Sequence, residues 1–276
     1  MSTVQTVPAG NAMHAYAFRS AMADLVGGLS RSELWLALGW HDIHQRYRRS
    51  VVGPFWLTIS MGMMVGGLAY LYAALFGQSI QQYLPYVAVG MIVFNFITSI
   101  ISDSTVAFIS SSRTILQTKA PLSIYVYQML WRNLLVFAHN MCIYLILIPF
   151  FDLKLGLVTL LAIPGLFFVL FAGFWSGIIL GALSARFRDV PPIVLSVMQI
   201  AFFLTPVFWT PASMKGREAF IYLNPFYYFL EVIRMPLLGE APSAVIWLGT
   251  VAMSGTGAIV ALVFFARYRA RIAYWI

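Results

Sequence analysis

The chain has 276 residues, of which 61% are hydrophobic and only 9% are charged. An ordinary soluble domain carries roughly 25% charged residues, and the mean hydropathy here is +0.84, so the composition excludes a soluble globular protein. A single cysteine, Cys142, excludes a disulfide framework and a cysteine-rich metal site. The net charge of +8 falls in short basic clusters between apolar stretches, which favours anionic phospholipid or an acidic partner over nucleic acid.

Gaps between charged residues locate the membrane spans, because an ionised group at the bilayer centre costs about 2.5–3.5 kcal/mol. No Asp, Glu, Lys or Arg occurs from 50 to 102, a stretch that accommodates two helices of ~20 residues. Four further apolar stretches follow, over 122–150, 155–185, 190–210 and 243–266. The sequence therefore predicts an all-α integral membrane protein with six transmembrane helices in one domain over 50–276.

Basic residues predict the orientation, since short loops rich in Lys and Arg stay in the cytoplasm. Twelve of the 17 lie on one predicted side and Arg132 lies within a span, whereas the other side has only Lys154, Lys215, Arg217 and Arg234. Both termini are therefore expected in the cytoplasm, with a cytoplasmic amino-terminal segment over 1–29. That region lacks the continuous apolar core of a signal peptide, so we expect the first transmembrane helix to remain in the membrane.

Residues 30–49 are predicted to form an amphipathic helix in the headgroup plane. Ser30 and Glu33 have the Ser-x-x-Glu spacing of a capping box, in which each side chain satisfies a backbone donor of the other's turn. Apolar residues recur at spacings of four, three and four, which suits an interfacial helix with its aromatic side down; they are Leu36, Trp40, Ile43 and Tyr47. A juxtamembrane helix without a function of its own fits the same pattern.

The segment over 211–242 is the least regular part of the chain. It contains an Asn-Pro step at 224–225, an aromatic run over 226–229, and Glu231 and Arg234, whose spacing allows a gating ion pair or only a helix cap. Neither half is long and apolar enough to span a membrane, yet the segment is too apolar for a free loop. A re-entrant helical pair on the periplasmic side satisfies both facts, provided that protein or water covers its backbone.

No motif for catalysis or metal binding is present. The chain lacks Gly-x4-Gly-Lys-Ser/Thr, so it has no P-loop for ATP, and it lacks His-Glu-x-x-His, Gly-x-Ser-x-Gly and metal-ligand spacings of His and carboxylates. His14, His41 and His44 lie in the amino-terminal region, where a solvated or interfacial histidine is the simpler interpretation. We therefore predict no catalytic residue, metal or cofactor in this chain.

Polar residues recur at a spacing of seven in the third predicted span. Arg132 and His139 have this spacing, and so do Asn133 and Asn140, and two helical turns bring each pair to nearly the same face. An ionisable residue within a membrane is a functional hypothesis by default, and the stripe could face a water-filled path. The favoured and simpler interpretation is that Arg132 pairs with Asp103 and holds the bundle together.

Aromatic residues are concentrated late in the chain, with ten among the 28 residues from 202 to 229. One interpretation is the usual interfacial belt of amphipathic rings. The other is that some rings line a conduit and stack on the apolar faces of sugars. The composition alone fits both.

Three motifs stand in order along the chain: Tyr-Arg-Arg-Ser-Val-Val-Gly-Pro-Phe-Trp at 47–56, Leu-Thr-Pro-Val-Phe-Trp at 204–209 and Leu-Asn-Pro-Phe at 223–226. Together with the length, the six expected spans and the bipartite segment before the last one, they resemble ABC-2-type permeases that export polysaccharides. The resemblance extends over nearly the whole chain. It is closest to the membrane subunit of O-antigen (lipopolysaccharide) exporters, with capsule and teichoic acid exporters as near relatives.

The resemblance implies a bacterial inner-membrane transport subunit and not an enzyme. Two copies would assemble with two copies of a separate ATPase, which binds the ATP and Mg. The permease dimer would enclose a channel that carries a polyisoprenyl-diphosphate-linked glycan from the cytoplasm to the periplasm. The helix over 30–49 corresponds to the family's gate-like helix, and the loop over 110–121 corresponds to the coupling helix that docks on the ATPase.

The resemblance also assigns residues. Contacts with the ATPase are expected from Arg113, Ile115, Leu116 and Lys119, and from a second site over 186–189 that includes Arg186 and Arg188. Channel-lining rings are expected at Trp56, Tyr70, Tyr72, Phe202, Phe208 and Trp209.

Two further groups are expected to act at the ends or within the spans. Basic side chains at the cytoplasmic face would attract the diphosphate headgroup, although the same residues are also explained by helix orientation; they are Arg46, Arg48 and Arg49. Polar residues with a gating or structural role are Asp103, Arg132, His139, Glu231 and Arg234.

Three other functions fit part of the sequence. An ABC-2 exporter of a drug or smaller lipid would have a shorter outer segment and fewer aromatics. A membrane enzyme that processes polyprenyl-linked sugars would cluster its acids or histidines at one face, whereas the nine acids here are scattered. A secondary transporter would show inverted repeats; we find no similarity between the halves, although six spans could contain three plus three.

Overall fold

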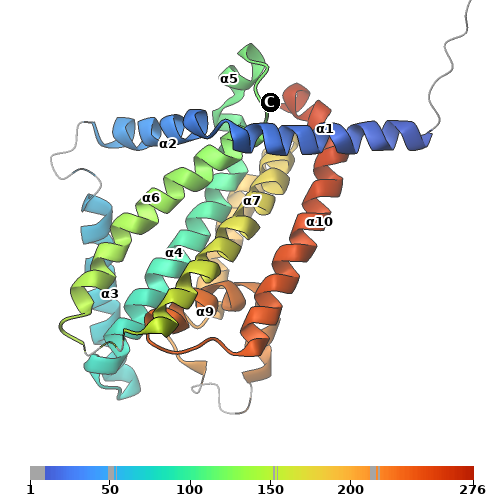
Figure 1. Ribbon diagram of the computed structural model, residues 1–276. Coiled ribbons are helices and arrows are strands. Elements are labelled where there is room, and N and C mark those ends of the chain that lie inside the picture. The colour runs from blue at the N-terminus through green and yellow to red at the C-terminus, as the bar shows by residue number, and fades with distance from the viewer. Residues whose placement is uncertain are drawn as a thin grey trace, which may run out of the picture.

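The computed structural model describes residues 10–48, 53, 55–151, 153, 155–211, 216 and 218–276, and these form helices, turns and connecting segments without a strand. Figure 1 shows a bundle of long tilted helices with two helices lying across one end. The bundle comprises α3 (Phe55–Phe76), α4 (Ile80–Ser110), α6 (Ser123–Leu147), α7 (Ala162–Arg186), α8 (Val190–Leu204) and α10 (Ala244–Trp275). Predictions that concern Arg49, Ser50, Lys154, Lys215 and Arg217 fall outside the described residues.

Five helices in the described part of the chain are long and apolar enough to cross a membrane: α3, α4, α6, α7 with its preceding 3-10 turn, and α10. This confirms the predicted all-α membrane fold. The predicted span over 190–210 contains only α8, whose 15 residues extend about 22 Å against a hydrocarbon core of about 30 Å. The sixth crossing therefore remains a prediction.

Helix α8 ends at Leu204 because a proline, Pro206, follows two residues later. Thr205 precedes Pro206, and the proline ring disfavours a helical conformation at the residue before it. Thr205 accordingly has extended backbone angles (φ −90°, ψ 139°), and its hydroxyl donates to the carbonyl oxygen of Ala201 at 2.7 Å. The chain then turns without helix over 205–210.

Helix α4 is the centre of the bundle and contacts α3, α6, α7, α8 and α9. Its closest approach to α7 uses a Gly-x3-Gly-x3-Gly series at 173, 177 and 181. A Cβ atom at Gly173 would lie 2.7 Å from Ile100, and one at Gly177 would lie 2.6 Å from Val126 on α6. Small residues at this spacing let helix backbones pack closely in a membrane, so α7 is fitted against α4 and α6 along one glycine face.

Helices α1 (Gly10–Ser30) and α2 (Ser32–Tyr47) lie across one end of the bundle, here called the α1–α2 end (Figure 1). Sequence reasoning did not assign α1. The predicted capping box is wrong, because Ser30 still belongs to α1 and its hydroxyl donates to the carbonyl oxygen of Gly27 at 3.1 Å. The residue that caps α2 is Arg31, which makes no side-chain capping bond.

The irregular segment near the carboxyl end of the chain forms a 3-10 helix, η3 (Glu218–Leu223), and α9 (Pro225–Leu237). These lie at the opposite end, here called the α9 end (Figure 1). Asn224 begins α9, since its side-chain oxygen accepts a hydrogen bond from the backbone N–H of Phe226 at 2.9 Å. Two short helices thus stand where the re-entrant pair is predicted, and their depth in the membrane stays a prediction.

The glycine face of α7 gives a direct test of the packing. We expect Gly177→Val to lower the stability of the purified protein by about 1–3 kcal/mol, because the added side chain overpacks the contact with α6. The measurement is thermal unfolding in detergent. Gly255→Val on α10 is the matched control, since a Cβ atom there meets nothing within 4 Å. Equal stability of the two variants would contradict the packing.

Candidate functional site

The guanidinium of Arg132 on α6 joins three helices. Its Nη1 donates to Oδ2 of Asp42 on α2 at 3.0 Å, and its Nη2 donates to Oδ2 of Asp103 on α4 at 2.9 Å. Gln128 donates to Asp42 at 2.8 Å, and Asn133 donates to Asp103 at 2.9 Å. The Arg132–Asp103 pair favoured by the sequence is therefore present, within a five-residue cluster that we call the Arg132 cluster.

Asp42 and Gln128 are the members of the Arg132 cluster that sequence reasoning missed. The apolar stripe on α2 was predicted to face the membrane, with Asp42 away from the stripe; within the stripe, Trp40 is 60% exposed and Ile43 is buried. The face of α2 that meets α6 carries Gly39 and Asp42. A Cβ atom at Gly39 would lie 2.8 Å from the Trp131 ring, so a glycine three residues before an acid, on nearly the same helix face, was the available signal.

The four residues of the predicted polar stripe on α6 do not all have the same surroundings in the structure. Arg132, Asn133 and Asn140 line one cavity of about 360 Å³ between α3, α4 and α6. His139 does not line this cavity; its Nδ1 lies 2.7 Å from the carbonyl oxygen of Leu135, and its ring meets the edge of Phe55. The gating or structural role predicted for His139 remains a prediction.

A second ionic contact fixes α1. The Asp24 side chain is fully buried, and its carboxylate accepts the backbone N–H groups of Leu122 and Ser123 at 3.1 and 3.0 Å. A carboxylate is favourable there because the first turn of α6 has unpaired N–H groups and a positive dipole end. Arg269 on α10 donates to the same carboxylate at 2.7 Å. Asp24 thus connects α1, α6 and α10.

The predicted ATPase-coupling residues gather at the α1–α2 end. The loop over 110–121 contains α5 (Ser112–Gln117), which contacts α10 and projects from this end (Figure 1). Within and just after α5, Arg113, Leu116 and Lys119 are exposed, whereas Ile115 is buried. Ile115 therefore holds α5 to the bundle, and the other three side chains face outward.

The second predicted coupling site and the headgroup arginines lie at helix ends. Arg186 ends α7, and its guanidinium lies 5.3 Å from the ring centre of Trp275 on α10; Arg188 is exposed in the following turn. Arg46 belongs to the last turn of α2, and Arg48 follows it with an exposed side chain. Arg49 is not among the described residues. The binding of a diphosphate headgroup by these arginines stays a prediction.

The predicted channel aromatics separate into two groups. Tyr72, Phe202 and Phe208 form one cluster, with ring centres 5.0 Å apart for Tyr72 and Phe208 and 5.5 Å apart for Phe202 and Phe208. Trp56 and Tyr70 on α3 do not join it and are 56% and 77% exposed. Trp56 lies in the first turn of α3, 16 residues before Tyr72, which is about 24 Å along a helix.

The turn after α8 is held by tyrosines of α4. The hydroxyl of Tyr83 donates to the carbonyl oxygen of Phe208, and that of Tyr86 lies 3.2 Å from the carbonyl oxygen of Pro206 and 3.0 Å from that of Trp209. These bonds fix residues 206–209, so the motif Leu-Thr-Pro-Val-Phe-Trp forms a structured corner.

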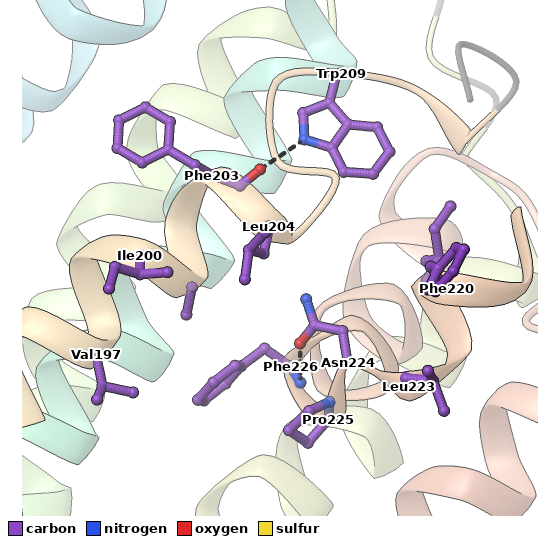
Figure 2. Close-up of a pocket in the computed structure, with 12 residues that line it drawn as sticks. Val197, Ile200, Phe203, Leu204, Trp209, Phe220, Leu223, Asn224, Pro225 and Phe226 are labelled. Carbon is purple, nitrogen blue, oxygen red and sulfur yellow. Dashed lines mark hydrogen bonds between the residues drawn. The ribbon is translucent and has the colours of Figure 1, made fainter. Parts of the chain in front are cut away.

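An apolar cavity of about 640 Å³ lies beside this corner, between α8 and the segment from η3 to the start of α9. Figure 2 shows Val197 and Ile200 on one side and Phe220, Leu223 and Pro225 on the other. Of the six predicted channel aromatics, only Trp209 lines it; its Nε1 donates to the carbonyl oxygen of Phe203 at 3.1 Å, as Figure 2 also shows.

The predicted Glu231–Arg234 ion pair is present and buried. Arg234 has no exposed side-chain surface; its Nε donates to Oε2 of Glu231 at 3.1 Å, and Nη1 donates to the carbonyl oxygen of Pro206 at 2.6 Å. Its guanidinium also lies 4.0 Å from the ring centre of Tyr86. Arg234 therefore joins α9 to α4 and to the corner after α8. Whether this pair gates remains a prediction.

In the described part of the chain, no three His, Cys, Asp or Glu side chains converge as a metal site would require.

A family model described as ABC-2 type transporter matches residues 33–238, which are 206 of the 276 residues and run from the first turn of α2 to the end of α9. No curated protein matches the chain.

The Asp24 contact predicts a stability effect at the α1–α2 end. We expect Asp24→Asn to cost about 1–3 kcal/mol, because the variant loses the pair with Arg269 and one acceptor at the start of α6. Arg269 is 35% exposed and water can solvate it in the variant, which keeps the cost below that of a fully buried pair. Chemical unfolding in detergent measures the difference.

Glu33→Gln is the control for the Asp24 variant, since Glu33 is an exposed acid on α2. If Asp24→Asn unfolds at the same denaturant concentration as Glu33→Gln, Asp24 does not hold α1 against α6 and α10.

Proposed function

The chain belongs to the ABC-2 type transporter family, and we propose that it is the permease subunit of an ATP-driven exporter for a polyisoprenyl-diphosphate-linked polysaccharide of the O-antigen type. The family places it as the membrane subunit of an ABC transporter. The proposed exporter contains two copies of this chain and two copies of a separate ATPase in the bacterial inner membrane, with both termini of the permease in the cytoplasm.

The observation that carries the transport mechanism is the exposed helix α5. It directly connects the two spans α4 and α6, and it presents Arg113, Leu116 and Lys119 outward at the α1–α2 end. A cationic, partly apolar surface of this kind suits docking on a separate protein. The sequence contains no P-loop, so the energy for transport is supplied by the ATPase subunit.

Movement of α5 has a defined route into the bundle. Residues 118–121 lead from α5 to the start of α6, where Asp24 binds Leu122 and Ser123 and also Arg269. A push on α5 therefore acts on α4, α6, α1 and α10 together. In the proposed mechanism, ATP binding closes the ATPase dimer, moves α5 and tilts the spans to open the path.

The glycan assignment is supported by the aromatic cluster at the α9 end. A long polar glycan needs a hydrated path across hydrocarbon, and aromatic rings bind the apolar faces of sugar rings. Tyr72 on α3 and Phe202 on α8 meet through Phe208. Helix α3 is the least buried of the five long apolar helices, and α8 has only two buried residues. These two helices offer the surface on which a second copy encloses the path.

The lipid anchor is proposed to start at the opposite end. Arg48 is exposed directly after α2, and Arg46 and Arg49 flank it in the sequence. Basic side chains at the membrane surface bind phosphate oxygens by charge and hydrogen bonds. The diphosphate headgroup would rest there while its prenyl chain stays in the bilayer.

Deletion of the gene tests the proposed function. In the deletion strain, lipid-linked polymer should accumulate on the cytoplasmic side of the inner membrane and disappear from the cell surface. The chemistry of the accumulated polymer distinguishes O-antigen from capsule and teichoic acid. Normal surface polymer in the deletion strain would refute export by this chain. Reporter fusions that place the two termini on opposite faces would refute the proposed topology.

Charge reversal in α5 tests the coupling. We expect Arg113→Glu and Lys119→Glu to reduce stimulation of the partner's ATPase by about fivefold or more, because each reverses a charge in a contact that depends on electrostatic complementarity. The amount of permease in the membrane should not change. Arg19→Glu, an exposed site on α1, is the control, and stimulation as strong in the α5 variants as in this control would place the docking surface elsewhere.

A further inference from the structure

The cavity between α3, α4 and α6 is the most polar one described inside the bundle. Its polar wall includes Ser60, Asn95, Ser99 and Asn140, and its volume of about 360 Å³ falls within the ~300–1,000 Å³ of small-molecule sites. Along α4 it runs from Asp103, in the Arg132 cluster, to Asn95 at the middle of the helix. These eight residues span about 12 Å, so the cavity leads from the α1–α2 end toward the centre of the bundle.

Charge determines which class of ligand the cavity can take. The cation on its wall is Arg132, whose Nη1 and Nη2 are bound by Asp42 and Asp103 and whose buried Nε has no hydrogen-bond partner within the described residues. One cation and two carboxylates leave a net charge of −1. A phosphate or other anion that approached the guanidinium would also approach these two carboxylates, which is unfavourable in a membrane interior of low dielectric constant. An uncharged ligand fits this balance.

The remaining polar groups suit a ligand with several hydroxyl groups. Amide and hydroxyl side chains both donate and accept hydrogen bonds, as a sugar hydroxyl does. Asn140 is 3% exposed, and its Oδ1 has no hydrogen-bond partner within the described residues. Buried acceptors of this kind are rare in folded proteins, and a ligand hydroxyl would donate to it.

Apolar side chains also line the cavity, on the same helices as the polar ones. They are Leu57, Met61 and Met64 of α3 and Val136 of α6. A pyranose ring has hydroxyl groups around its edge and apolar C–H faces, so one ring can meet both the amides and the aliphatic side chains of this lining. Methionine also adapts to irregular shapes, which suits a site that takes similar sugars.

We propose that this cavity is a binding site for one neutral pyranose ring in each subunit. The site lies apart from the aromatic cluster at the α9 end, and it would hold a sugar unit in the half of the bundle nearer the α1–α2 end. The identification of that ring as part of the cargo rests on the proposed function, whereas binding itself is a property of this chain.

Photolabelling tests the proposal. The full chain is purified without glycoside detergents and placed in nanodiscs. The probes are photoreactive pyranosides of glucose, galactose, mannose and N-acetylglucosamine. At least one should label the chain saturably, with peptides of α3, α4 or α6 modified. The free methyl pyranoside should compete, and inorganic phosphate should not.

Variants of the cavity wall make the test specific. We expect Asn140→Ala and Ser99→Ala each to reduce labelling by about fivefold or more, the effect of one lost hydrogen bond to the ligand. Gln81→Ala, which removes an exposed amide outside the cavity, should label as the natural chain does. If Asn140→Ala does not fold, as judged by size-exclusion chromatography, Ser60→Ala replaces it.

Either of two labelling results would overturn the site: no saturable labelling by any of the four probes, or equal labelling of the natural chain and the variants of the cavity lining. Competition by phosphate alone would assign the cavity to anions and also overturn it. The proposed function is judged separately by export in the deletion strain. A chain that is needed for export but binds no pyranoside refutes this site alone, and a chain that binds pyranosides but is not needed for export refutes the function alone.

Discussion

The arrangement of the α1–α2 end depends on how one guanidinium is neutralised inside a membrane protein. An unpaired charge in hydrocarbon costs several kcal/mol, and Arg132 avoids this cost by binding Asp103 on the neighbouring span and Asp42 on α2. The second contact determines more of the structure than the first, because α2 is not a span. To reach Arg132, α2 has to lie across the end of the bundle with Asp42 and Gly39 toward α6. The rotation of α2 follows from this contact.

The helices are held together by one kind of interaction at the two ends of the molecule and by another kind in its middle. Ionic contacts at the α1–α2 end connect α1, α2, α4, α6 and α10 through Arg132 and Asp24. At the α9 end, Arg234 connects α9 to the corner after α8. Between them, α7 packs on α4 and α6 through glycines without polar bonds. Ion pairs and hydrogen bonds hold the helix ends, whereas only apolar packing holds the spans to each other. This arrangement is compatible with helices that tilt while their ends remain attached.

The sequence predicts those parts of this structure that depend on local composition. Long apolar stretches give the spans, and a spacing of three gives the Glu231–Arg234 pair, whereas the coupling loop that contains α5 was implied only by the family resemblance. The end of α8 was also accessible, since the Thr-Pro step at 205–206 disfavours continuation of the helix. Asp24 was not accessible, because its partners lie 98 residues away at Leu122 and 245 residues away at Arg269. The facing of α2 and the positions of Trp56 and Tyr70 likewise depend on helix rotation, which neighbouring helices determine and hydropathy does not.

A double-mutant cycle between Asp42 and Arg132 measures the central contact most directly. The free energy of unfolding of the full chain in detergent would be determined for the natural sequence, Asp42→Asn, Arg132→Gln and the double variant. A direct bond between α2 and α6 predicts a coupling energy of about 1–2 kcal/mol, with the double variant less destabilised than the sum of the single ones. Additivity within about 0.5 kcal/mol, the result for independent sites, would show that Asp42 does not hold α2 to Arg132.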